Sequence, residues 1–363
     1  MSGPAATERS RDVLRMLGNR YRTWQRPRSL GLVLALLTLI AVGSILSPHF
    51  LTVTNLLNVA RQMSIVGIVG IGMTFVILTA GIDLSVGSIL GFSAIAGATM
   101  LSSGVPGPLA IVLTLAAGGV VGALNGLGVA WGGVQPFIMT LAMLVIARGV
   151  TMTYSNGQPI PLGPAGSDVA WIGTASLLGI PVPFWLLVIV FGAALFVLKN
   201  TRFGWHVYAV GGNREAARRS GLNTRRTIFA VYVISGVLAA ISALIVISRL
   251  TAGEPSQGTG LELDAIAVVV IGGTSLFGGM GSVGGTMVGA AIVALMANLL
   301  NLLGVSPFSQ QIVMGLIILG AVLLEGRARR ARQARTQPAA GGNARPAATR
   351  AEPRALQEET RGV

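Results

Sequence analysis

The sequence predicts an all-α polytopic membrane protein with about ten transmembrane helices and with both termini in the cytoplasm. Hydrophobic residues make up 52% of its 363 residues and charged residues only 10%, whereas a soluble domain carries about 25% charged residues. Several apolar runs approach or exceed the roughly 20 residues that cross a bilayer as a helix. A third observation, the placement of the cations, gives these spans their direction.

Most of the positive charge lies in three segments. By count, 23 of the 26 Lys and Arg residues lie in Arg9–Arg28, Lys199–Arg226 and Arg327–Arg361. The positive-inside rule places such segments on the cytoplasmic side of the membrane. Membrane topology therefore accounts for the net charge of +14, and we expect no nucleic-acid partner.

These segments divide the chain into three parts. Residues 1–28 are predicted to form a basic cytoplasmic tail and residues 29–325 the transmembrane domain. Residues 326–363 are rich in Ala, Arg, Pro and Gln, a composition that predicts a disordered cytoplasmic tail. We expect both basic tails to attract membrane lipid.

Ten apolar runs supply the spans in chain order. They are Leu30–Leu46, Thr54–Thr79, Val86–Leu101, the run after Pro106-Gly107-Pro108, the run opened by Val134-Gln135-Pro136-Phe137, Phe184–Leu198, Thr227–Ser248, the glycine-broken Leu261–Phe277, Gly284–Leu303 and Ser309–Leu324. The first run exceeds the roughly 7–15 residues of a signal-peptide core and no A-x-A cleavage site follows it, so it is taken as a span. Alternation then places residues 155–183, a loop rich in Pro and Gly, outside and residues 199–226 inside.

Polar residues and glycines punctuate these spans. Asp83 and Ser85 interrupt the apolar sequence after the second span, and either can cap the helix that follows by accepting from its free N–H groups. Gly118, Gly122 and Gly126 recur every four residues in the fourth span. Such a ladder predicts close packing against another helix.

A weak internal repeat indicates two five-helix halves. Leu78-Thr79-Ala80-Gly81 recurs as Leu250-Thr251-Ala252-Gly253 and Pro136-Phe137 as Pro307-Phe308, at offsets of 172 and 171 residues. Because five is odd, the halves would have opposite orientations, as in many transporters. Short matches in apolar sequence also arise by chance, so a chain without a repeat stays an alternative.

The cytoplasmic segment 199–226 carries seven Lys and Arg residues against one acid, Glu215. Glu215-Ala216-Ala217-Arg218-Arg219-Ser220-Gly221 is predicted to be a short helix, because Glu, Ala and Arg favour helices and Gly221 suits the left-handed position after a helix. A charged helix this short lies in water at a membrane face. It is either part of an ordinary cytoplasmic loop or a docking helix on which another protein pushes.

Several kinds of chemistry are excluded. The chain has no cysteine and two histidines, without an H-E-x-x-H pair, so we expect no metal site and no cofactor. Its single lysine, Lys199, does not belong to a phosphate-binding G-x-x-x-x-G-K-[ST] motif. The sequence shows no acid–base or nucleophile group of residues of the kind that an enzyme needs. If the protein uses ATP, another subunit must hydrolyse it.

Four motifs mark the chain. They are Gly81–Ser88 (GIDLSVGS), Gln135–Leu141 (QPFIMTL), Phe203–Asn213 (FGWHVYAVGGN) and Asp264–Gly279 (DAIAVVVIGGTSLFGG). Together they resemble the ribose-type sugar permeases of ATP-binding-cassette (ABC) importers, in the wider family of binding-protein-dependent permeases for branched-chain amino acids and sugars. The resemblance runs from about Leu30 to Leu324 and leaves both tails out.

The resemblance implies a permease subunit in a bacterial cytoplasmic membrane that moves a monosaccharide inward. Such subunits pair as homodimers or heterodimers, bind ABC ATPase subunits, and receive sugar from an extracytoplasmic binding protein. Glu215-Ala216-Ala217-x-x-x-Gly221 is similar to the E-A-A-x-x-x-G loop of importer permeases, whose short helix sits in a cleft of the ATPase. The residues that this similarity assigns to ATPase coupling are Glu215, Ala216, Ala217, Arg218 and Gly221.

A hydrated sugar needs a polar path, and polar groups within spans usually face such a path. The candidates for the substrate pathway are Asn125, Gln135, Phe137, Asn298, Asn301 and Phe308. For the asparagines the alternative is a hydrogen bond between neighbouring helices, and for the phenylalanines it is ordinary packing. The polar residues expected to be structural are Asp83 and Ser85 as helix caps, Arg148 against backbone carbonyls or an acid, and Asp264 at a helix N-terminus.

Two other functions stay open. An ion-coupled secondary transporter of a small polar solute would show uptake that follows an ion gradient without an ATPase, although no carboxylate stands out within a span. An ABC permease for a non-sugar substrate is the second alternative. The sequence does not choose among solutes, because a few pathway residues and the binding protein set specificity.

Overall fold

The computed structural model describes residues 30–317, 319–320 and 323. The chain divides into two units, residues 1–322 and 323–363. The predicted cytoplasmic tails, 1–28 and 326–363, lie outside the described residues. Everything that follows concerns the first unit.

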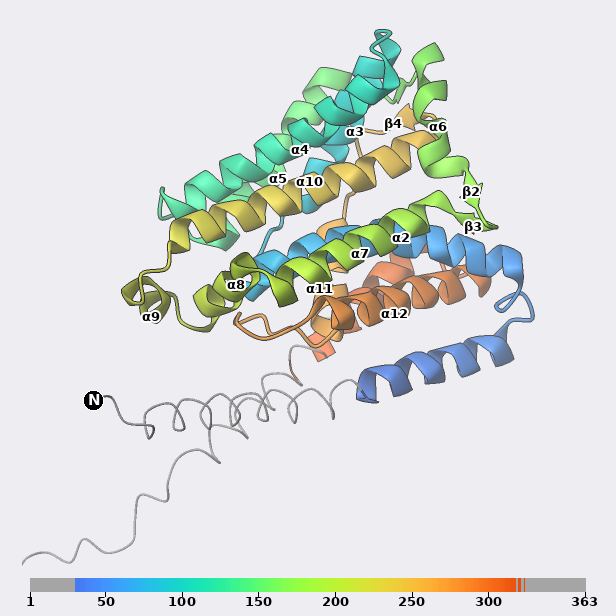
Figure 1. Ribbon diagram of the computed structural model, residues 1–363. Helices are drawn as coiled ribbons and strands as arrows, with labels where there is room; N and C mark the ends of the chain where they lie inside the picture. The colour runs from blue at the N-terminus through green and yellow to red at the C-terminus, as the bar shows by residue number, and fades with distance from the viewer. Residues whose placement is uncertain (1–29, 318, 321–322, 324–363) are drawn as a thin grey trace, which may run out of the picture. The chain divides into compact units, whose positions relative to one another are not determined.

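Helices make up most of this unit (Figure 1). A first helix covers Leu30–Leu46. The other helices are α2 (Val53–Leu78), α3 (Val86–Ser102), α4 (Gly107–Ala130), α5 (Pro136–Ser155), α6 (Ser167–Thr174), α7 (Val182–Asn200), α8 (Arg202–Gly212), α9 (Arg214–Arg219), α10 (Thr224–Leu250), α11 (Leu261–Ile271) and α12 (Val283–Leu302), with a 3-10 turn η1 at Pro164–Gly166. Four two-residue strands are β1 (Ile160–Pro161), β2 (Ser176–Leu177), β3 (Ile180–Pro181) and β4 (Ala252–Gly253). A further helix begins at Pro307 and continues through residue 317.

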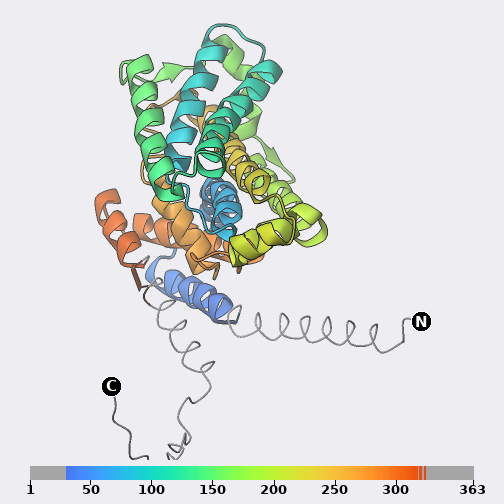
Figure 2. The same cartoon turned by 90° about the vertical axis from the view of Figure 1, so that its left-hand side faces the viewer.

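Helices α2 and α10 form the centre. Helix α10 packs against α2, α3 and α4, while α2 also packs against α7, α11 and α12, as Figures 1 and 2 show from two sides. The second half of α2, from Gly67 to Leu78, is buried at every residue. The outer helices α4, α5 and α7 instead expose apolar side chains, as expected of surfaces that face lipid.

The glycine ladder of α4 packs against α10, as the sequence predicts for close helix contact. A Cβ added to Gly122 would lie 2.4 Å from the backbone oxygen of Tyr232, and one added to Gly236 would lie 2.3 Å from that of Gly118. The two helix backbones therefore touch without side chains between them. Such contacts stabilise helix pairs where no hydrophobic force draws helices together.

We predict that Gly236→Ala destabilises the protein by roughly 1–3 kcal/mol, because the added methyl group meets backbone that cannot rotate away. Gly192→Ala on α7 is the matched control, since a Cβ there has nothing within 4 Å. In detergent, the thermal unfolding midpoint should fall for the first variant and stay level or rise for the second. Equal midpoints for both would contradict the close crossing.

Opposite ends of the helices carry different structures. Strand β1 pairs with β4 through Ile160 opposite Gly253, which brings the segment between α5 and α7 to the end of α10. Helix α6 lies at this same end, and α9 lies at the other (Figure 1). The predicted external loop and the predicted cytoplasmic segment thus lie at opposite ends of the helices.

Two details differ from the sequence-based expectation. Residues 155–183 are not a plain loop but hold α6 and three short strands. The span expected over Leu261–Phe277 is the 11-residue helix α11, which ends early because Gly272 and Gly273 follow and Gly273 has a φ of +82°. At about 1.5 Å per residue α11 reaches only about half of a bilayer core.

By length and composition, six helices of the described chain can cross a membrane, namely α2, α4, α5, α7, α10 and α12. Helix α3 and the helix Leu30–Leu46 have 17 residues each, which is about the lower limit for a span. A mostly helical protein with six candidate membrane spans is therefore confirmed, while the number of ten spans and the cytoplasmic position of both termini stay predictions.

Candidate functional site

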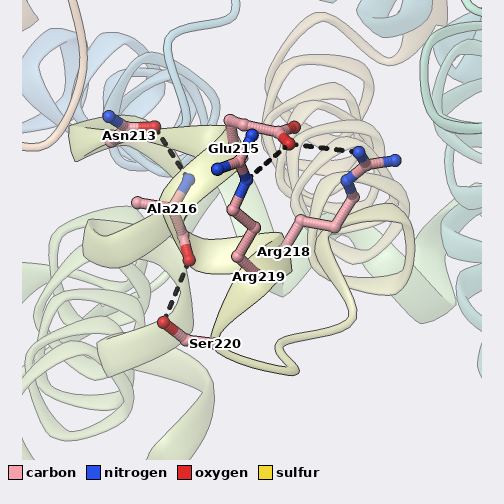
Figure 3. A network of polar contacts seen from close by, with 6 residues as sticks. All are labelled: Asn213, Glu215, Ala216, Arg218, Arg219 and Ser220. Atoms are coloured by element: carbon pink, nitrogen blue, oxygen red, sulfur yellow. Dashed lines mark hydrogen bonds and ion pairs between the residues drawn. The ribbon is translucent and has the colours of Figure 1, made fainter.

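The short cytoplasmic helix expected from the sequence is α9, Arg214–Arg219 (Figure 3). Asn213 caps its start, because Asn213 Oδ1 accepts from Ala216 N at 2.9 Å. Ala217 is 5% exposed and anchors one face of the helix to the protein. Glu215, Arg218 and Arg219 point outward and are exposed.

Gly221 ends α9 in the way that the sequence predicts. Its φ is +84°, a left-handed conformation that costs little only for glycine. Leu222 N donates to Ala217 O at 3.1 Å and Gly221 N to Arg218 O at 3.0 Å. These two bonds form the Schellman motif, which satisfies the last carbonyls of a helix. Because α9 has only six residues, it depends on such bonds at both ends.

The exposed face of α9 is cationic. Glu215 Oε1 accepts from Arg219 Nε and from Arg218 Nη2, both at 3.1 Å (Figure 3). Hydrogen bonds from Arg219 and Arg218 lower the pKa of the Glu215 carboxyl. Their support for the helix is therefore present above the ordinary carboxyl pKa and is lost as the pH falls through the lowered value. Glu215, the single acid of the segment, therefore pairs with arginines of its own helix.

A surface pocket of about 410 Å³ lies beside this helix. Its lining residues are Arg214, Glu215, Arg218, Thr224 and Arg225. The pocket joins the exposed face of α9 to the first turn of α10, where Asn223 Oδ1 accepts from Arg226 N at 3.0 Å. An acidic surface would complement the charge of this face.

Helix α8, Arg202–Gly212, precedes α9 and was not expected from the sequence. Thr201 caps α8 by accepting from Gly204 N at 3.2 Å. The aromatic ring of Phe203 in α8 stacks on that of Phe75 in α2, with ring centroids 6.5 Å apart. Tyr208 donates to Gly281 O at 3.0 Å. The threonine cap, followed by buried residues three apart (Gly204, Val207 and Val210), is the signal that could have predicted this helix.

Asp83 lies at a polar break between α2 and α3 and is 0% exposed. Its Oδ1 accepts from Ser85 N at 3.0 Å and from Ser85 Oγ at 2.6 Å, and its Oδ2 accepts from Ser235 Oγ on α10 at 2.9 Å. Ser85 Oγ in turn accepts from Asn125 Nδ2 on α4 at 2.7 Å. The four residues connect α3, α4 and α10.

This network corrects the expected capping role. Ser85 occupies the N-cap position of α3, but its side chain accepts no capping bond from the helix. Asp83 binds the N–H of Ser85 itself, which lies before the first helical residue. The reason is tertiary, since the second oxygen of the carboxyl group is directed to α10 rather than to the first turn of α3. Asp83 therefore joins helices as well as shaping the break.

Two of the pathway candidates are engaged in helix packing. Asn125 is 0% exposed and bonded to Ser85. Asn298 on α12 exchanges two amide hydrogen bonds with Asn55 on α2, both at 2.8 Å, and is 5% exposed. These bonds match the alternative of interhelical hydrogen bonds.

The other candidates lie on exposed surfaces. Phe137 is 47% exposed and Phe308 80% exposed, Gln135 is exposed before α5, and Asn301 is exposed and accepts from Gln310 Nε2 at 2.7 Å. Phe137 and Phe308 belong to opposite ends. Phe137 follows Pro136, which lines a pocket of about 340 Å³ together with Arg214 of α9. Phe308 follows α12, whose Asn298 bonds to the beginning of α2. The six candidates do not form one lining.

Arg148 and Asp264 lie where structural roles were expected. Arg148 Nη1 donates to the carbonyl oxygens of Pro255 at 2.7 Å and Gln257 at 2.9 Å, so it holds the segment after β4 against α5. Asp264 lies in the first turn of α11, where a negative charge interacts favourably with the helix dipole.

Most of the chain matches known proteins. Residues 55–322 match the family described as the branched-chain amino acid transport system / permease component. The chain is 46% identical over 312 residues to the ribose import permease protein RbsC of Escherichia coli (strain K12), covering 85% of this chain and 97% of that protein. It is 46% identical over 298 residues to the ribose import permease protein RbsC of Bacillus subtilis (strain 168), covering 82% and 92%.

A relative with a different sugar in its name matches as well. The xylose transport system permease protein XylH of Escherichia coli (strain K12) is 38% identical over 341 residues, covering 77% of this chain and 87% of that protein. No solved structure is significantly similar to this chain. The matched range includes α2 from Asn55 onward and every later element through α12, the short helix α9 and the break at Asp83 among them. The chain therefore belongs to the branched-chain amino acid transport system permease family, and its relatives named above are sugar permeases.

Proposed function

We propose that the protein imports ribose or a closely similar monosaccharide, with α9 as the helix that couples it to an ABC ATPase. The chain is a multi-pass inner-membrane permease subunit of an ABC sugar importer. The observation that carries the choice of sugar is the 46% identity with a ribose import permease along 97% of that protein. A xylose permease is 38% identical and covers less of both chains.

The coupling role of α9 is supported by its position and chemistry. It is exposed, cationic, capped at both ends and anchored by Ala217. The chain has no phosphate-binding motif of its own, so ATP hydrolysis belongs to separate ATPase subunits. An acidic cleft on the ATPase would receive Arg214, Arg218 and Arg219, and Glu215 orients two of these three cations.

We propose further that α9 lies in the cytoplasm and that the β1–β4 end lies outside. Cations support this assignment, since residues 199–226 carry seven Lys and Arg residues while 155–183 carry none. An extracytoplasmic sugar-binding protein would dock on the external end, where α6 and the short strands lie. Ten segments enter the membrane, with α11 reaching only part of the way, and both termini are cytoplasmic. A second permease copy completes the path.

The bounds of the helices support an inverted repeat. Subtracting 172 from the bounds of α10 (224–250) gives 52–78, against 53–78 for α2, and subtracting it from those of α12 (283–302) gives 111–130, against 107–130 for α4. Helix α2 ends near α9, whereas α10 begins beside α9 and ends at β4, so corresponding helices run in opposite directions. This arrangement is typical of transporter repeats.

The test is uptake in proteoliposomes that hold the permease with its ATPase and binding protein. Labelled ribose should accumulate only with ATP, ATPase and binding protein together, and unlabelled ribose should compete better than xylose or allose. A protonophore should have no effect. Uptake driven by an ion gradient without the ATPase would identify a secondary transporter instead, and ATP-dependent uptake that no sugar competes would identify a non-sugar substrate.

A further inference from the structure

Helix α9 is joined to α8 by a single residue. Asn213 N donates to Ala209 O at 3.1 Å and so closes α8, while Asn213 Oδ1 accepts from Ala216 N at 2.9 Å and so opens α9. No loop separates the two helices. A displacement of α9 therefore moves the last turn of α8 with it.

That last turn lies backbone to backbone against two other segments. A Cβ on Gly211 would lie 1.7 Å from the carbonyl oxygen of Leu78, the last residue of α2, and 2.6 Å from Gly279 N. These two groups are bonded to each other, Gly279 N donating to Leu78 O at 2.9 Å. A Cβ on Gly278 would lie 2.8 Å from the Cβ of Ala80. We name Leu78, Ala80, Gly211, Gly278 and Gly279 the glycine junction.

The glycine junction joins parts of the chain that are far apart in sequence. The end of α2, the end of α8 and the loop after α11 meet there with almost no side-chain atoms between them. Side chains can change rotamer and absorb a small displacement, but touching backbone cannot. Closely packed elements of this kind pass a displacement on instead of deforming continuously.

The chain leaves the glycine junction directly into the polar break. Only Gly81 and Ile82 separate Ala80 from Asp83, which is bonded to Ser85 at the start of α3 and to Ser235 on α10. The segment is therefore held at one end by the glycine junction and at the other by α3 and α10. A displacement at Ala80 would therefore act on the bonds that join α3 to α10.

We infer that the glycine junction transmits the displacement of α9 to the polar break at Asp83, and that Gly211 and Ala80 are positioning residues for transport. This inference rests on the proposed coupling role of α9. It adds the route by which the pull of the ATPase on a six-residue surface helix reaches the helices α2, α3 and α10 inside the membrane domain.

The test compares two adjacent glycines in the complete importer. Gly211→Ala inserts a methyl group into the contact with Leu78, whereas Gly212→Ala inserts one where nothing lies within 4 Å. For Gly211→Ala we expect the ATP hydrolysed per sugar transported to rise about tenfold, within the range usual for coupling between sites. Gly212→Ala should keep the wild-type ratio. A merely structural role would lower uptake and ATP hydrolysis together, with less complex recovered and an unchanged ratio.

A second variant tests the inference if Gly211→Ala yields no assembled importer. Ala80 has a φ of 62°, so Ala80→Gly suits the backbone and removes only the methyl group that faces Gly278. We expect normal amounts of complex with an increased ATP-to-sugar ratio. A wild-type ratio in Ala80→Gly, or equal ratios in the Gly211 and Gly212 variants, would overturn the inference. Absence of ATP-dependent uptake in the wild-type importer would instead contradict the proposed function.

Discussion

Replacing Gly221 by valine is expected to lower ATP-dependent uptake by roughly 5- to 30-fold while the membrane domain stays folded. Gly221 has a φ of +84°, and this conformation costs a non-glycine residue about 1–2 kcal/mol. A Cβ at this position meets nothing within 4 Å, so the penalty comes from the backbone alone. This penalty weakens the Schellman hydrogen bonds that end α9.

The control for this prediction is Gly221→Asn, because asparagine enters the left-handed region more readily than other residues. Uptake, stimulation of the ATPase and the amount of assembled importer should be measured for both variants. We expect the valine variant to lose uptake and stimulation, and the asparagine variant to keep most of both. If valine coupled as well as glycine, α9 would not be the coupling helix.

Glu215→Gln should have a much smaller effect. Glu215 is exposed and its two arginine partners lie on its own helix, and exposed ion pairs add little to stability because water and salt screen them. The fold of α9 therefore depends more on the glycine that ends the helix than on its ion pairs.

Replacing Asp83 by leucine is expected to destabilise the membrane domain by at least about 2 kcal/mol, since each buried donor left unpaired costs roughly 1–3 kcal/mol. The change removes the acceptor of Ser85 N, Ser85 Oγ and Ser235 Oγ together. The midpoint of thermal unfolding in detergent and the recovery of the importer should both fall, and uptake should fall with them.

Two further variants make this prediction specific. Ser235→Ala removes one interhelical hydrogen bond, which contributes only about 0.6–2 kcal/mol in membrane proteins. Ser88→Ala removes a buried hydroxyl that donates only to Ser85 O near the start of its own helix, so it should change the midpoint least. An unchanged midpoint for Asp83→Leu would mean that the network does not support the break.

Local signals in the sequence were enough for α9. The residues Glu215–Gly221 favour a helix and its glycine stop whatever surrounds them, because helix propensity and the left-handed preference of glycine are properties of neighbouring residues. The glycine ladder in α4 likewise predicted a close crossing, although the sequence did not say that α10 is the partner. Composition and the length of the apolar runs predicted a polytopic helical protein.

Other sites depended on residues distant in the chain. Asp83 was taken as a helix cap, and only the approach of Ser235, 152 positions later, makes it a connection between helices. Asn125 and Asn298 could line a path or join helices, and their partners Ser85 and Asn55 show them in helix contacts. Arg148 was expected to meet backbone carbonyls, which proved to be those of Pro255 and Gln257.

The sequence by itself determined that the chain is a membrane protein, which end of its helices is cationic, and that a short capped helix lies at that end. It could do so because hydropathy, charge placement and helix capping depend on composition and on residues a few positions apart. Tertiary structure alone decided that Gly211, Leu78 and Gly279 meet, that α11 ends early, and that Asp83 joins α3 to α10. Contacts between residues 68 to 201 positions apart depend on how whole helices pack, and no local pattern encodes that packing.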